Sequence, residues 1–241
     1  MIDLHCHVLP EVDDGPKSWE VAEAMCRMAA EDGIEHIVAT PHSNDFYFFD
    51  REYLSGLIQE LERRVGPQPR LSLGCDFHLS FDNMQSAKRT PERYSIDGSR
   101  YLLVEFSNVS ISSLVDEWFI HMHQRGVTPI ITHPERNPII QQDPRRVLKW
   151  IELGCAVQVT ASVFTGLWGT RARQIADWLL KEEAVHFLST DAHDNQRRVP
   201  ILSPARKIIS EHYGDELAEV LVRKNPAAVL KNQPLPYFIR P

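Results

Sequence analysis

Two histidines, His5 and His7, close a short and mostly apolar stretch at the start of the chain. If residues 2–7 form a strand, the two imidazoles lie on the same face, because side chains alternate between the faces of a strand. A pair of imidazoles placed in this way can chelate a metal ion. Histidines also pack in protein cores, so the pair by itself supports packing and metal binding about equally.

A histidine or a carboxylate recurs at the end of one apolar segment after another. These residues are His42, Asp76, Glu105, His133, Asp191 and His193. Glu105 is the single charged residue of segment 101–106, and burying it without a partner would cost on the order of several kcal/mol. The repetition favours one shared polar site over unrelated packing roles. Packing or surface roles are assigned to the remaining histidines, which are His36, His121, His123, His186 and His212, while His78 lies close to Asp76.

Apolar segments alternate with segments of helical periodicity along the chain. The predicted strands are residues 2–7, 34–40, 70–77, 101–106, 128–132, 156–160 and 184–190. Helical patterns cover about 18–33, 51–65, 114–125, 144–153, 171–181 and most of the chain after 204, whereas 80–99 is expected to be irregular. This alternation predicts an α/β fold with a parallel sheet, most simply a closed (β/α) barrel of about seven strands that is similar to a TIM barrel.

The carboxyl ends of the strands of such a barrel share one rim, so the strand-end residues would converge there. These eight nitrogen and oxygen ligands are more than one tetrahedral ion can bind, so they predict two or three divalent ions. The mixture of imidazole and carboxylate suits manganese, iron or zinc. Clusters of this kind activate a bound water near neutral pH and hold phosphoryl oxygens. Hydrolysis of a phosphoester is therefore the expected chemistry.

The composition of the chain indicates its domain organisation, its partners and its cellular location. The chain has 241 residues, 43% of them hydrophobic, and no linker-like stretch, which predicts a single domain over 1–241. A net charge of −7 argues against nucleic acid as the main partner. Neither an export signal nor an apolar stretch of membrane-spanning length is recognisable, so no stable membrane insertion is expected. The four cysteines, which are widely spaced, indicate reduced thiols and a cytoplasmic location.

Several motifs together resemble the polymerase and histidinol phosphatase (PHP) family. They are His5-Cys6-His7, Asp14-Gly15, Pro41-His42, Glu105, His133-Pro134-Glu135-Arg136 and Asp191-Ala192-His193. Segment 12–18, the strand containing Glu105 and the His133 motif are similar, more closely, to the bacterial metal-dependent protein-tyrosine phosphatases of capsule and exopolysaccharide loci. The resemblance extends to about Asn225 and Pro226. It implies a distorted barrel of about seven strands with a site for three metal ions.

The resemblance also implies a role for each motif residue. The first ion would be held by His5, His7, Asp76 and Asp191, the second by Asp76, Glu105 and His133, and the third by Asp14, His42 and His193. Asp13 is the alternative to Asp14. The phosphatases usually have glutamate where this chain has Asp76, whose side chain is shorter by one methylene. Arg136 and Arg198 match positions that contact phosphate, with Arg197 as the alternative to Arg198.

The predicted activity is hydrolysis of phosphomonoesters, foremost protein phosphotyrosine, by attack of a metal-bound hydroxide. The substrate would be a phosphotyrosine-bearing protein such as the tail of a bacterial tyrosine kinase, and oligomerisation is left open. Cys6 is not expected to act as the nucleophile, because the Cys-x5-Arg loop of cysteine phosphatases is absent. Three alternatives remain: a phosphatase for a small metabolite such as histidinol phosphate, an amidohydrolase, and a non-catalytic metal-stabilised binding module.

Overall fold

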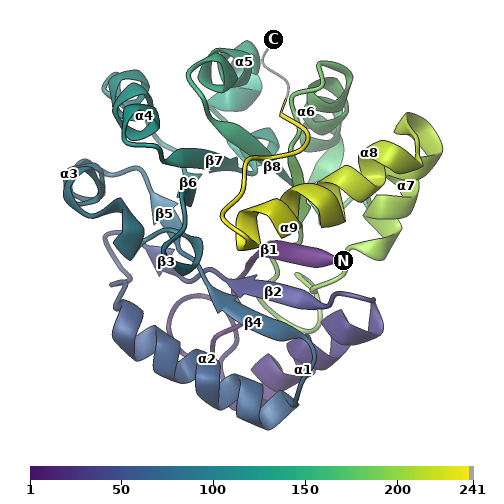
Figure 1. Ribbon diagram of the computed structural model, residues 1–241. Helices are drawn as coiled ribbons and strands as arrows, with labels where there is room; N and C mark the ends of the chain where they lie inside the picture. Colours follow the sequence, from purple (N-terminus) through teal and green to yellow (C-terminus); the bar gives the residue numbers. More distant parts are fainter. Residues whose placement is uncertain (239–241) are drawn as a thin grey trace.

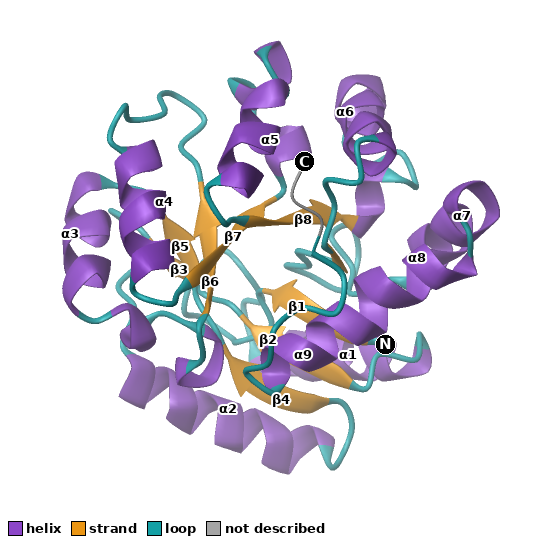
Figure 2. Ribbon diagram, turned by 45° about the horizontal axis from the view of Figure 1, so that its top comes forward, coloured by secondary structure: helices purple, strands orange, loops and turns teal. Residues whose placement is uncertain are grey.

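Strands and helices alternate along the chain, as the hydrophobic pattern predicts. The computed structural model describes residues 1–238, so the last three residues of the predicted 1–241 domain lie outside the described residues. The strands are β1 (Ile2–Cys6), β2 (His36–Ala39), β3 (His42–Ser43), β4 (Arg70–Leu73), β5 (Asp76–His78), β6 (Tyr101–Glu105), β7 (Thr128–Thr132), β8 (Ala156–Thr160) and β9 (Phe187–Ser189). Figures 1 and 2 show them gathered in the middle of the molecule with helices around them.

The α-helices lie close to the predicted segments, with the exception of α3. They are α1 (Trp19–Glu31), α2 (Arg51–Val65), α3 (Phe81–Arg89), α4 (Val115–Gln124), α5 (Arg145–Glu152), α6 (Gly169–Lys181), α7 (Ser203–Tyr213), α8 (Asp215–Glu219) and α9 (Asn225–Leu230). A π-helical turn, Val220–Lys224, joins α8 to α9. Among the described residues, no helix combines the length and the apolar character that crossing a bilayer requires.

All strand pairs are parallel and fall into two sheets, of order β1-β2-β4 and β3-β5-β6-β7-β8-β9. The predicted α/β fold with parallel strands is confirmed, but strands within residues 1–238 do not form one closed sheet. The sheets separate where Pro41 lies between β2 and β3 and Gly74 lies between β4 and β5. Proline has no N–H for a strand ladder and glycine weakens strands. The predicted strand 70–77 therefore breaks in two at Gly74, whereas the predicted strand 34–40 ends before Pro41 and β3 follows it as a separate short strand.

The chain runs on from one sheet to the other between β2 and β3 and between β4 and β5, and a hydrogen bond joins the sheets on the opposite side. Gly74 N–H donates to Ala39 O (2.8 Å), and Asp76 N–H donates to Pro41 O (3.1 Å). On the other side, His7 N–H donates to Ala192 O (2.8 Å), next to a parallel bridge between Cys6 and Ala192. The carboxyl ends of β1 and β9 are therefore held next to each other.

A small apolar cluster fills the space that both sheets surround. Its members come from β1, β2, β6, β7, β8 and β9 together with α9, and include Leu4, Val38, Leu103, Ile130, Ala156, Phe187 and Val229. Each fully buried side chain of this size contributes about 1.5–3 kcal/mol of transfer free energy. A larger cluster lies between the strands and the surrounding helices.

The helix α9 and the segment after it cover the amino ends of the strands. Asn225 Nδ2 donates to His186 O (3.0 Å), just before β9, and Arg100 N–H donates to Asn232 Oδ1 (3.0 Å), just before β6. Figures 1 and 2 show α9 crossing in front of β1. The carboxyl ends point to the opposite side, where they are free to carry a polar site.

Residues 80–99 are not irregular throughout, and the prediction was wrong for α3. Ser80 caps this helix by accepting a hydrogen bond from Asn83 N–H, and Met84 and Ala87 are buried one turn apart. Only these two positions of the helix are buried, since Phe81 is exposed, and a pattern this short is too weak for the periodicity to show in the sequence. Ser18 lies at the position directly before α1, although its side chain makes no capping hydrogen bond.

His186 is a buried histidine that directly precedes β9, at the amino end of the strand. The Val157 N–H donates to its Nδ1 (3.1 Å), and burial lowers its pKa from the ordinary 6.5 to about 3. The imidazole therefore stays neutral in the folded protein at pH values where the unfolded chain is protonated.

We expect this histidine to make the protein less stable in mild acid. Between pH 6.5 and 3 the unfolded chain binds a proton at His186 that the folded protein does not, so the free energy of unfolding falls as pH falls. The loss between pH 7 and pH 5 should be about 2 kcal/mol. Urea denaturation of the wild type and of His186→Asn, whose amide oxygen replaces the Nδ1 acceptor without titrating, measures it. An equal loss in both proteins would contradict the prediction.

Candidate metal centre

The strand-end residues named in the sequence analysis converge at one polar cluster. Four overlapping groups have ligand atoms within 4.8 Å of one another: His7, Asp14, His42 and His193; His5, His7 and Asp76; His5, His133 and Asp191; and His42, Asp76 and Glu105. All nine predicted metal ligands are included. The set Asp14, His42 and His193 occurs intact, with His7 added to it. The other two predicted sets are divided differently, because His133 groups with Asp191 and His42 groups with Glu105.

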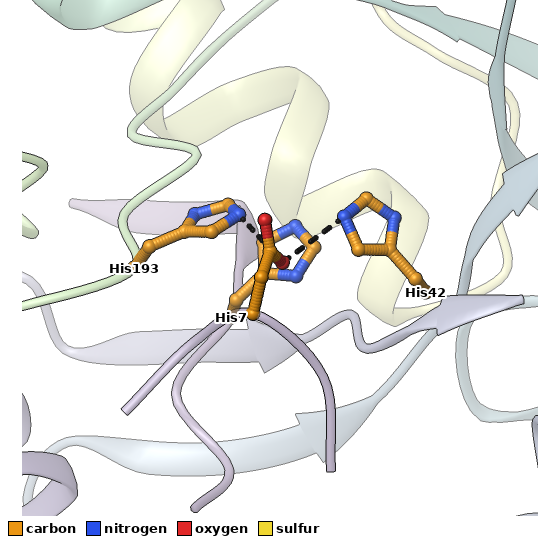
Figure 3. Close-up of side chains that lie close together, drawn as sticks. His7, His42 and His193 are labelled. Atoms are coloured by element: carbon orange, nitrogen blue, oxygen red, sulfur yellow. Dashed lines mark ion pairs between the residues drawn. The ribbon is translucent and has the colours of Figure 1, made fainter. Parts of the chain in front are cut away.

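Asp14 lies between two histidines that come from opposite parts of the chain. Its Oδ1 is 3.3 Å from His42 Nε2 and 3.3 Å from His193 Nε2. Figure 3 shows these two rings facing each other across His7, with dashed lines for the two ion pairs. Asp14 is half-exposed, whereas His7 and His193 are buried. The group therefore opens towards solvent on the carboxylate side.

Asp13 has a different position from Asp14 and bonds to the far side of His7. Its Oδ2 accepts from His7 Nδ1 (2.7 Å) and from His42 N–H (3.1 Å), and its Oδ1 accepts from Gly15 N–H (2.8 Å). Gly15 is needed there, because a Cβ would lie 2.7 Å from His7 O. Both oxygens of Asp13 are thus occupied, and it orients His7 so that Nε2 points into the cluster.

The protonation of His7 follows from this contact. Burial alone would lower its pKa, but the Asp13 carboxylate raises it to about 10. A divalent cation competes with the proton on Nε2 while the Asp13 contact at Nδ1 remains available. The geometry supports Asp14 as the ligand and Asp13 as the residue that positions a ligand.

His5 is held on its far side by an amide rather than by a carboxylate. Its Nδ1 lies 3.1 Å from Gln158 Oε1, and its Nε2 lies 3.4 Å from both Asp76 Oδ2 and Asp191 Oδ1. Gln158 is a polar residue inside the otherwise apolar strand β8 and is fully buried. This pattern is visible in the sequence, but Gln158 was not among the predicted site residues.

Asp191 bonds in two directions. Its Oδ1 lies 3.4 Å from His7 Nε2, while its Oδ2 accepts from Arg136 Nη1 and from Arg198 Nη2 (2.6 Å). Burial alone would raise its pKa, but Arg136, together with His5 and Arg198, holds the pKa well below its ordinary range. Asp191 is therefore an anion at any physiological pH, with one oxygen directed at the histidines.

The two predicted phosphate-contacting arginines thus lie beside the metal-ligand cluster. A polar cavity of about 170 Å³ is lined by both guanidinium groups and by seven of the predicted ligands, including Asp14, Asp76 and Glu105. Arg197, in contrast, is exposed and lines a separate surface groove. The structure places Arg198, and not Arg197, at the cluster.

Two carboxylates on neighbouring strands, Asp76 and Glu105, repel each other. Burial and the charge of Asp76 raise the pKa of Glu105 to about 7. For Asp76 itself burial would raise the pKa, but His5 and then His42 keep it below its ordinary value. A cation between the two carboxylates would remove this repulsion.

Asp76 reaches its neighbours although it is shorter than glutamate. Its Oδ2 lies 3.4 Å from His5 Nε2, 3.3 Å from His42 Nδ1 and 3.9 Å from His7 Nε2. The start of β5 therefore brings the aspartate close enough to three histidines without the additional methylene.

Two of the strand-end residues adopt a backbone conformation that is uncommon for side chains other than glycine. His133 has a φ of 34° and Asp191 has a φ of 50°. This left-handed conformation costs on the order of 1–3 kcal/mol and recurs at functional sites. Here it follows β7 and β9 directly and turns the chain sharply at the cluster.

The cluster fits divalent cations by two further observations. Both carboxylate oxygens of Asp76 and the Nδ1 of His42 are buried without a hydrogen-bond partner within residues 1–238. In addition, four carboxylates, those of Asp14, Asp76, Glu105 and Asp191, face only two guanidinium groups. Buried nitrogen and oxygen atoms without hydrogen bonds, beside several carboxylates, are what ions such as manganese, iron or zinc require.

Comparisons with known proteins identify the family of the chain. The chain matches the family described as "Capsular polysaccharide synthesis, CpsB/CapC" over residues 1–231. It is 30% identical to the tyrosine-protein phosphatase YwqE of Bacillus subtilis, over 97% of this chain and 92% of that protein. It is 32% identical to the putative tyrosine-protein phosphatase CapC of Staphylococcus aureus, with the same coverage of both chains.

A solved structure is also similar over the whole fold. It is one of the crystal structures of YwqE from Bacillus subtilis and CpsB from Streptococcus pneumoniae, which are described as "unique metal-dependent tyrosine phosphatases". The TM-score is 0.89 at 27% sequence identity, covering 100% of this chain and 98% of the other.

Replacing Asp13 by alanine should weaken the binding of divalent cations by about 10- to 100-fold, because His7 loses the carboxylate that orients its ring. Asp13→Asn should have a smaller effect, since the amide oxygen can still accept from His7 Nδ1–H. Equilibrium dialysis against Mn²⁺ followed by metal analysis measures both. The exposed acid Asp82, changed to alanine, is the control. Wild-type affinity in Asp13→Ala would show that Asp13 does not position His7.

Proposed function

Because the chain belongs to the CpsB/CapC family of capsular polysaccharide synthesis, we propose that it is a metal-dependent phosphatase that hydrolyses protein phosphotyrosine. The observation that carries the proposal is the position of Arg136 and Arg198 beside the polar cluster of histidines and carboxylates. The relatives YwqE and CpsB are named tyrosine-protein phosphatases, which supports phosphotyrosine as the substrate class. The reaction splits a phosphomonoester into a phenol and inorganic phosphate.

The cofactor we propose is a set of two or three divalent ions, of manganese, iron or zinc. Its predicted ligands are His5, His7, Asp14, His42, Asp76, Glu105, His133, Asp191 and His193, and the overlapping groups support more than one ion. When bound, such ions lower the pKa of water, so that it can attack phosphorus near neutral pH, and neutralise the phosphoryl oxygens.

The protein's own residues bind and orient the phosphoryl group. The Nε atoms of Arg136 and Arg198 are buried and have no hydrogen-bond partner in the described part of the chain. Both guanidinium groups also line the polar cavity of the cluster, where phosphoryl oxygens can accept from them, and the planar guanidinium matches two oxygens at once. The contacts with Asp191 fix both side chains before substrate binds.

Cys6 does not supply the nucleophile in this proposal. It is fully buried between His5 and His7, and burial raises the pKa of its thiol well above the ordinary value. A protonated and inaccessible thiol cannot attack phosphorus. The reaction is thus proposed to proceed without a phosphocysteine intermediate.

The rim of the site favours a protein over a small metabolite such as histidinol phosphate. The side chains of Phe46 and Phe48 are 90% and 80% exposed in the loop that follows β3. Tyr47, between them, stacks on His42 with 6.0 Å between ring centroids. Exposed aromatic residues next to a polar site suit the apolar flank of a peptide. The presence of all predicted ligands argues against a non-catalytic binding module.

The setting of the reaction belongs to the same proposal. We propose that the chain forms one domain over 1–241. We place it in the cytoplasm because its four cysteines, Cys6, Cys26, Cys75 and Cys155, are free and buried. The proposed partner is a phosphotyrosine-bearing protein such as the tail of a bacterial tyrosine kinase. Nucleic acid is not a proposed partner, given the net charge of −7, and self-association is a matter for experiment.

The metal-loaded protein should hydrolyse a phosphotyrosine peptide and a generic aryl phosphate, and do so faster than histidinol phosphate. A chelator should abolish the activity, and Mn²⁺ should restore it. Cys6→Ser should keep most of the activity, whereas Asp76→Ala should lose both activity and bound metal. Initial rates of phosphate release measure all four outcomes. A preference for histidinol phosphate would favour the small-metabolite phosphatase, and hydrolysis of none of the three would favour the binding module.

Arg198→Ala should lower kcat/KM for the aryl phosphate by about 10- to 100-fold, because hydrogen bonds to an ionised phosphoryl group are lost. The adjacent Arg197→Ala is the matched control and should remain close to the wild type, since Arg197 is exposed outside the cluster. Steady-state kinetics and metal analysis of both variants measure the difference. If the two variants lose activity equally, Arg198 has no special role in binding the phosphoryl group.

A further inference from the structure

The indole ring of Trp168 lies against the guanidinium groups of both Arg136 and Arg198. The Cζ of Arg136 is 3.7 Å from the centroid of its indole ring, and the Cζ of Arg198 is 5.4 Å from the same ring. These two arginines are far apart in sequence, and Trp168 directly precedes α6. One aromatic side chain is thus shared by two cations.

The indole is itself held in place. Its Nε1–H donates to Ser162 Oγ (2.8 Å), in the 3-10 turn after β8. Its ring also packs against the main apolar core and is half-buried. Because the tether and the packing fix the ring, it can fix the groups that stack on it.

A guanidinium group donates hydrogen bonds in its plane and stacks through its faces. The in-plane donors of Arg136 and Arg198 already reach Asp191, and both Nε donors are still without a partner in residues 1–238. Stacking on Trp168 holds these cations without using any donor. Two neighbouring positive charges repel each other, so an electron-rich face beside both lowers the cost of keeping them together.

Trp168 also borders the space next to the metal-ligand cluster. A cavity of about 140 Å³ is lined by Trp168, Phe106 and Asn137 together with Glu105, His133 and Arg136. The last three residues also line the cavity of the cluster itself. The indole therefore stands at the boundary between the candidate ligands and the adjoining pocket.

We propose that Trp168 is a positioning residue, which holds Arg136 and Arg198 as a pair with their free donors available to phosphoryl oxygens. The inference rests on the proposed function, in which these arginines bind the phosphoryl group. It predicts that removing the indole weakens the binding of phosphate and of substrate without removing metal.

The test compares Trp168→Leu and Trp168→Phe in the Mn²⁺-loaded protein. Trp168→Leu should weaken the binding of inorganic phosphate, measured by titration calorimetry, by about 10-fold. It should raise KM for an aryl phosphate by a similar factor, with a smaller change in kcat and unchanged metal content. Trp168→Phe keeps an aromatic face and should recover most of the affinity. Trp178→Leu, at a half-buried tryptophan of the same helix, is the control and should bind phosphate as the wild type does.

A double-mutant cycle shows whether Trp168 acts through the arginines. In an Arg198→Ala background, Trp168→Leu should weaken phosphate binding by clearly less than about 10-fold. Equal phosphate affinity in the wild type and Trp168→Leu, or fully additive losses with Arg198→Ala, would overturn the inference. So would a wild type that binds no phosphate. A wild type that hydrolyses no aryl phosphate but binds phosphate through Trp168 would refute the proposed function and support this inference.

Discussion

The charge of Asp191 is the constraint on which the site depends. A fully buried carboxylate is stable only if positive or hydrogen-bonding groups surround it. Asp191 meets this requirement with Arg136 and Arg198 on one oxygen, while its other oxygen faces His5 and His7. Its N–H also donates to His5 O (2.8 Å), which ties the last strand to the first. One residue therefore joins the closure of the fold, the candidate ligands and the arginines.

A second set of residues orients the histidines from behind. Asp13 holds the far nitrogen of His7, and Gln158 holds that of His5. Such contacts select which nitrogen faces a metal and restrict the ring to one orientation. The two supports differ in charge, so His7 is bound to an anion and His5 to a neutral amide. We infer that the two histidines, although only two residues apart, differ in their basicity towards a cation.

The two ends of the strands serve different purposes. At the amino ends, α9 and an apolar cluster containing Leu4, Phe187 and Val229 close the interior. At the carboxyl ends, charged and polar side chains project, and left-handed turns at His133 and Asp191 bring them inward. Burial of apolar surface at one end provides the stability that offsets the strain and the like charges at the other.

The sequence by itself determined that parallel strands alternate with helices and that a histidine or carboxylate ends most strands. Both are local patterns: side-chain periodicity selects the element, and a polar residue after an apolar run is readable without knowing any neighbour. Helix α3 was missed because only Met84 and Ala87 mark its buried face. The break of the sheet at Pro41 also escaped, although the proline was visible, because strand pairing determines whether the interruption divides a sheet.

Only the tertiary structure decided which residues act together. Asp13 and Asp14 are adjacent in sequence, yet they lie on opposite sides of His7, and backbone contacts with Gly15 and His42 determine this difference. The pairing of Arg136 with Arg198 on Trp168 likewise depends on three loops that follow different strands. Such contacts join segments that no local pattern relates. The local sequence thus shows the secondary structure and the candidate ligands, whereas the packing of distant segments determines how those ligands lie relative to one another.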